Sequence, residues 1–64
     1  MPEIDTFNEF MVGTNRDNLI IMLPPKPGQL LTKERALGLA AWLVALADPG
    51  GELFDDVLEA VMQT

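Results

Sequence analysis

The side chains best able to do chemistry in this chain of 64 residues are carboxylates, and they gather near the C-terminal end. Five of them fall within twelve positions: Asp48, Glu52, Asp55, Asp56 and Glu59. Such a cluster could bind a divalent cation, but the stretch from Asp48 to Glu52 lacks the alternating oxygen ligands of a calcium loop. A basic protein partner could instead bind Asp55, Asp56 and Glu59. The third interpretation is a solvated helix face whose first acids stabilise the helix dipole.

Other catalytic chemistry is limited by the residue types that are missing. The chain has no cysteine, histidine or tyrosine, and no serine occurs in it either. Disulfides, thiolate zinc sites and histidine ligands are therefore excluded, and the common pairs of nucleophile and general base cannot be assembled. We predict a protein that is not an enzyme and that uses no metal and no cofactor.

The net charge of −6 limits which partners the protein can bind. The four basic residues are scattered through the first 35 positions: Arg16, Lys26, Lys33 and Arg35. Because nucleic-acid binding needs clustered lysine and arginine, nucleic acid is not an expected partner, and neither is an anionic membrane surface. The longest apolar run is too short to span a bilayer, and the acidic N-terminus does not resemble a signal peptide. We therefore expect a cytoplasmic protein.

That apolar run, from Ala36 to Ala47, is the strongest structural signal in the sequence. Over twelve residues its only polar side-chain group is the indole N–H of Trp42. A helix that is apolar all round must be covered on every side, and a chain of this size has little material with which to cover one. Without disulfides or metals, oligomerisation is the remaining way to reinforce so small a core. The sequence therefore predicts self-association.

The whole chain, residues 1–64, is predicted to form one small α+β domain. We expect a β-hairpin followed by two α-helices (ββαα), with the core completed by homo-oligomerisation. Hydrophobic patterning and turn residues divide it into a loose tail, two strands and two helices. The Pro24–Gly28 segment is predicted to be a stiff connector, and its match to the PxxP pattern is the alternative. Thr32 is the expected N-cap of the first helix. The predicted elements are the tail at 1–6, strands at Phe7–Val12 and Leu19–Leu23 around a turn at Gly13–Asn18, and helices at Lys33–Ala47 and Glu52–Met62.

The first helix presents two different faces at 100° per residue. We expect its bulky face, which is Leu39, Trp42, Leu43 and Leu46, to pack on the chain's own hairpin and second helix. The other face is mostly small and should pack against the same helix of a partner about a two-fold axis. Alternatively, the hairpin and the second helix cover one face each and the protein is a monomer. The predicted self-association residues are Leu37, Gly38, Ala40, Ala41, Val44 and Ala45 of the helix, with Ile20 and Met22 of the second strand. Trp42 is either a core residue or an interface anchor.

Two segments, Asn18–Pro25 and Leu39–Ala47, carry a pattern that extends over residues 7–64, and Ala40-Ala41-Trp42-Leu43-Val44 is its most distinctive part. In these segments the chain resembles small ββαα proteins encoded by phages and prophages. The resemblance implies a phage-associated accessory protein in the cytoplasm of a bacterial host. It implies no activity, cofactor or binding residue.

The sequence thus favours a small non-catalytic interaction or assembly protein that binds itself as a homodimer or higher oligomer. The alternative is an acidic regulatory protein that binds a basic protein through Asp55, Asp56 and Glu59. A further alternative is a transcription regulator of the ribbon-helix-helix kind, since that fold also has a strand and two helices in a small dimer. Charge disfavours it, because Leu19–Leu23 offers nothing to phosphates or base edges.

Overall fold

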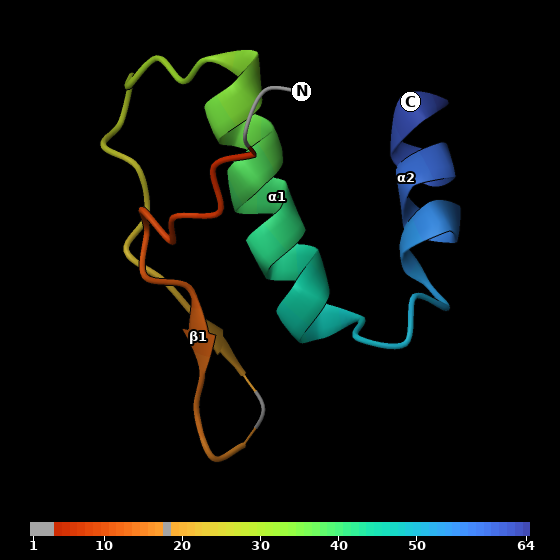
Figure 1. Ribbon diagram of the computed structural model, residues 1–64. Helices are drawn as coiled ribbons and strands as arrows, with labels where there is room; N and C mark the ends of the chain where they lie inside the picture. The colour runs from red at the N-terminus through yellow and green to blue at the C-terminus, as the bar shows by residue number, and fades with distance from the viewer. Residues whose placement is uncertain (1–3, 18) are drawn as a thin grey trace.

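The computed structural model describes residues 4–17 and 19–64, and it shows a two-stranded antiparallel hairpin followed by two helices. The elements are β1 (Gly13–Thr14), β2 (Ile20–Ile21), α1 (Lys33–Ala47) and α2 (Phe54–Met62). Their order confirms the predicted ββαα arrangement. The hairpin lies beside α1, and α2 stands apart on the far side of α1 (Figure 1). Residues 1–3 of the predicted tail and Asn18 of the predicted turn lie outside the described residues.

The first strand is not where the sequence predicted it. The strand expected at Phe7–Val12 is wrong, and β1 occupies two residues that were assigned to the turn. The cause is the side chain of Asn8, whose Oδ1 accepts from the N–H of Val12 and whose Nδ2 donates to its carbonyl, both at 2.9 Å. The Met11 N–H also donates to the Asn8 carbonyl, and Met11 has a φ of 50°. An asparagine that bonds its own backbone in this way favours a turn over a strand.

The hairpin carries the small core of the described chain. Its register pairs Gly13 with Ile21 and Thr14 with Ile20. Beyond the strands, the Leu23 N–H donates to the Phe10 carbonyl at 2.8 Å, so the two arms stay together. Among the described residues only two hydrophobic side chains are buried, those of Phe10 and Val12.

The second arm of the hairpin has one covered side and one open side. Ile20 and Met22 are half-buried, whereas the side chains of Leu19, Ile21 and Leu23 are exposed. Because strand residues alternate between the two faces of a sheet, the half-buried side chains lie on one face and the exposed ones on the other. The cover that the sequence predicted for both faces is therefore not supplied by a single chain.

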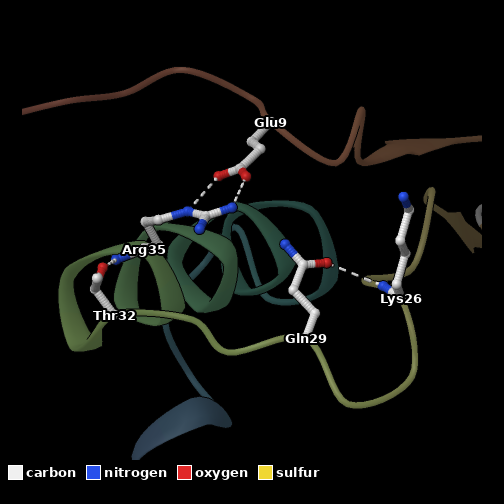
Figure 2. A network of polar contacts seen from close by, with 5 residues as sticks. All are labelled: Glu9, Lys26, Gln29, Thr32 and Arg35. Atoms are coloured by element: carbon white, nitrogen blue, oxygen red, sulfur yellow. Dashed lines mark hydrogen bonds and ion pairs between the residues drawn. The ribbon is translucent and has the colours of Figure 1, made fainter.

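The connector to α1 contains a tight turn. The Gln29 N–H donates to the Lys26 carbonyl at 2.9 Å, and the Lys26 N–H donates to Oε1 of Gln29 at 3.0 Å (Figure 2). Pro27 and Gly28 occupy the two central positions, and Gly28 has a φ of 77°. That combination is typical of a type II turn, where glycine supplies the positive φ.

Helix α1 has the predicted bounds. Oγ1 of Thr32 accepts from the Arg35 N–H at 3.1 Å, which makes Thr32 the N-cap (Figure 2). The helix ends at Ala47, and its C-cap is Asp48, whose N–H still donates to the Val44 carbonyl before the chain turns at Pro49. Local signals decided both ends, because the residue before a proline avoids the helical conformation.

Helix α2 differs from expectation in two ways. It begins at Phe54 rather than Glu52, and Leu53 at its N-cap position makes no side-chain capping bond. It was also expected to pack on the bulky face of α1. Instead α2 stands away from α1, and every one of its residues except Phe54 is exposed (Figure 1).

Candidate functional site

The N-terminal segment and α1 together form an apolar surface. Residues 4–6, part of the predicted loose tail, lie across α1, and the carbonyl of Thr6 accepts from the indole N–H of Trp42 at 3.2 Å. Trp42 is half-buried, so this bond satisfies the one polar side-chain group of the apolar run Ala36–Ala47. The segment thereby becomes one wall of a groove.

We call this hollow the α1 groove; it has a volume of about 550 Å³. Two acidic residues, Asp5 and Glu34, also border it, but most of its lining is apolar. Its apolar lining includes Ile4, Leu37, Gly38, Ala41, Trp42 and Ala45.

The predicted self-association residues divide into two groups. Leu37, Ala41 and Ala45 are exposed along the α1 groove, and Leu37 keeps 70% of its surface accessible. The other predicted residues are half-buried in the single chain: Gly38, Ala40, Val44, Ile20 and Met22. The open apolar residues of the hairpin are instead Leu19, Ile21 and Leu23.

Helix α2 provides a second uncovered apolar surface, which we call the α2 stripe. Helical spacing places its members on one side of α2, with the carboxylates on the other. Val57 exposes 57% of its surface and Met62 exposes 76%. The α2 stripe consists of Leu53, Val57, Leu58, Val61 and Met62.

The opposite side of α2 carries the acids that could meet a basic partner. Asp55 and Asp56 lie in the first turn and Glu59 in the second, and all three are exposed. Glu59 accepts from the side-chain amide of Gln63 at 3.2 Å. The first two also lie where acids stabilise a helix dipole, so their position alone does not distinguish a binding role from a structural one.

Asp48 joins the two helices. Its Oδ2 accepts from the N–H groups of Leu53 at 2.9 Å and Phe54 at 2.8 Å, and its Oδ1 accepts from Glu52 at 3.2 Å. These bonds stabilise the charged carboxylate, so they lower the pKa of Asp48. The Gly51 N–H returns to the Asp48 carbonyl at 2.9 Å, and Gly51 has a φ of 69°. One residue thus ends α1 and caps the start of α2.

An ion pair fastens the N-terminal segment to the start of α1. The Arg35 guanidinium donates to both carboxylate oxygens of Glu9, with Nε at 3.1 Å from Oε2 (Figure 2). Bonding to the Glu9 carboxylate raises the pKa of Arg35. Both side chains are partly exposed, so the pair positions the segment rather than adding much stability.

A smaller cavity of about 140 Å³ lies beside this ion pair, and three carboxylates border it: Asp5, Glu9 and Glu34. Glu9 already forms an ion pair with Arg35, so its carboxylate is not free to act together with a neighbouring one. Within residues 4–17 and 19–64, no group of three metal-ligating side chains is arranged to hold a metal ion.

Two features of the site were missed by sequence reasoning. Asp48 caps a helix from six residues away, whereas a standard N-cap bonds two or three residues ahead, so spacing rules do not find it. The role of Ile4–Thr6 was missed because nothing in the segment is periodic. The available signal for a packing role of this segment was its isoleucine, Ile4.

Comparison with known proteins gives no relative: no protein-family model, curated protein or solved structure matches this chain. In the part of the chain that the structure describes, neither helix combines the length and the apolar character needed to cross a membrane.

Proposed function

We propose that this protein is a small self-associating interaction or assembly protein whose core is completed between copies. The supporting observation is the amount of surface left open. The chain exposes 5888 Å², whereas a folded monomer of its mass exposes about 4,000 Å². The excess of about 1,900 Å² is larger than the roughly 800 Å² that each partner buries in a standard interface.

The shape of the chain supports the same proposal. Its radius of gyration is 13.1 Å, compared with about 11 Å for a compact domain of this length. The open surface includes apolar side chains of the α1 groove and of the α2 stripe, where Leu37 is 70% and Val61 is 64% exposed. Apolar surface of this extent is typical of proteins that bind another protein.

Light scattering on a sizing column, repeated over a hundredfold dilution, tests this function. We expect a mass of at least twice the 7.0 kDa of one chain at the highest concentration. Dilution should lower the mass if the assembly is reversible. A folded species of single-chain mass at every concentration contradicts the proposal.

The resemblance to phage and prophage proteins supports an accessory role in a phage-infected or lysogenic bacterium. The alternative function, binding of a basic protein, is favoured by one observation. The exposed acids Asp55, Asp56 and Glu59 lie opposite the α2 stripe, so they stay accessible when the stripe is covered. Replacing Asp55 and Asp56 with lysine should abolish binding to an immobilised lysine-rich peptide and leave self-association intact. Undiminished binding contradicts this alternative.

A further inference from the structure

We infer that two copies exchange their second helices, so that the α2 stripe of each copy occupies the α1 groove of the other. This inference rests on the proposed self-association and names the surfaces that meet. Both surfaces are on the same chain, and each lacks cover within it: Leu37 is 70% exposed and Val61 is 64% exposed. A second copy supplies both covers at once, because contacts in a two-fold dimer occur in pairs.

The two surfaces match in length and in side-chain size. Helix α2 has nine residues, which correspond to about 13 Å, and the groove between Leu37 and Ala45 spans about 12 Å of helix. The groove is lined by small residues such as Gly38 and Ala41, while the stripe offers branched side chains such as Val57. Large residues facing small ones let two helices approach closely and interdigitate.

Charge also permits this pairing. Asp56 and Glu59 of α2 lie on the side away from the stripe, so these two carboxylates stay in solvent when the stripe is seated. Asp5 and Glu34 border the α1 groove and are both exposed. The groove is mostly apolar, and the polar group of Trp42 already has the Thr6 carbonyl as its partner. Burial of the groove therefore leaves no indole N–H without a hydrogen bond.

The joint at Asp48 explains why the stripe of one chain does not cover its own groove. Bonds from the Leu53 and Phe54 N–H groups to Asp48, together with the turn at Gly51, fix the direction in which α2 leaves α1. In that direction α2 stands apart from α1 (Figure 1). Folding back would break these bonds, whereas docking on a second copy keeps them.

Exchange also accounts for more of the open surface than pairing of two α1 helices does. An α1–α1 dimer covers the groove and leaves the α2 stripe bare on both copies, with Met62 at 76% exposure. Exchange covers the α1 groove and the α2 stripe on both copies.

Cross-linking of single-cysteine variants tests the exchange, since the natural chain has no cysteine. A tagged Ala41→Cys chain is mixed with an untagged Val57→Cys chain, oxidised gently and separated without reductant. We expect the mixed disulfide to form on the order of a hundredfold faster than either homodimeric disulfide, because apposed thiols meet at an effective concentration in the millimolar range. Asp56→Cys, on the acidic side of α2, is the matched control and should not cross-link to Ala41→Cys.

Other cross-linking patterns overturn the exchange. Rapid disulfides of Ala41→Cys with itself indicate paired α1 helices, and those of Val57→Cys with itself indicate paired α2 helices. A chain that carries both Ala41→Cys and Val57→Cys gives a further check. If it forms only an intrachain disulfide, α2 folds back on its own chain. The pair Ala45→Cys and Val61→Cys repeats the test if either first variant loses its helical circular dichroism.

The mass of the natural protein separates the two proposals. A dimer by light scattering with the wrong cross-links contradicts the exchange and leaves the self-association standing. A monomer at every concentration contradicts both.

Discussion

At the scale of single residues, Asp48 connects the end of α1 to the start of α2. It ends α1 through its backbone, and its carboxylate bonds the N–H groups that open α2. The first N–H groups of a helix have no partner within the helix, so a carboxylate beside them is doubly favourable, as an acceptor and as a charge at the positive end of the dipole. The lowered pKa of Asp48 is the measurable sign of this role.

Replacement of Asp48 by asparagine should therefore weaken α2 in a way that depends on pH. Because the folded-state pKa is lowered, the charged carboxylate contributes stability above its ordinary pKa of about 3.9, and that contribution is lost as the pH falls through the lowered value. At pH 7 we expect the natural chain to be more stable and more helical than Asp48→Asn. The difference should vanish in strong acid. Urea unfolding followed by circular dichroism between pH 7 and pH 2 measures it, and a difference that does not change with pH contradicts the role.

Gly38 gives a second prediction at this scale, because it lies in the middle of α1 and also lines the α1 groove. A Cβ at this position meets nothing within 4 Å in the single chain. Gly38→Ala should therefore stabilise α1 by about 1 kcal/mol. If another helix fills the groove, the added methyl should weaken self-association by about 1–3 kcal/mol, or roughly 5- to 150-fold in the dissociation constant.

Thermal unfolding and sizing of Gly38→Ala measure these two effects separately. Gly13→Ala is the matched control, since a Cβ there also meets open space and the position lies outside the groove. It should leave the dissociation constant unchanged. Equal dissociation constants for Gly38→Ala and the natural chain would mean that no helix packs closely against this glycine.

At the scale of elements, the sequence predicts best where its signals are local. Both ends of α1 are correct because Thr32 caps one and Asp48-Pro49 ends the other. The hairpin exists but is displaced, since the side-chain bonds of Asn8 convert part of the expected first strand into a turn. Strand propensity depends strongly on context, so residue types alone did not indicate this competition.

Helix α2 shows the other limit of sequence reasoning. Periodicity correctly identified Val57 and Val61 as members of one apolar side. It does not say which surface covers that side, because an amphipathic helix has the same pattern whether it packs on its own chain or on another. Packing of α2 on the bulky face of α1 was therefore the wrong choice. Of the α1 groove, the sequence predicted the face of small residues on the helix. It did not predict the wall at Ile4–Thr6, because that segment has no periodicity.

For the whole molecule, the proposed self-association predicts that folding depends on concentration. Stability that comes from binding a partner falls by mass action as the chains are diluted. Trp42 is the only tryptophan and borders the α1 groove, so its fluorescence reports whether the groove is covered.

Dilution should therefore shift the emission of Trp42 to longer wavelength and make it easier to quench with iodide. The change should follow the loss of mass seen by light scattering, because both report the same dissociation. Val57→Glu is expected to show the shifted spectrum at higher concentrations than the natural chain. An emission spectrum that stays constant while the mass falls would show that the interface lies away from Trp42.

The open α2 stripe also bears on the fate of newly made chains. A chain that has not yet met a second copy presents Val57, Val61 and Met62 on a helix held out from the rest of the molecule. Exposed apolar segments of this kind attract chaperones and proteases, which continuously remove incompletely folded chains. The lifetime of the protein should therefore lengthen with its own abundance, so that rare chains are degraded and abundant ones persist.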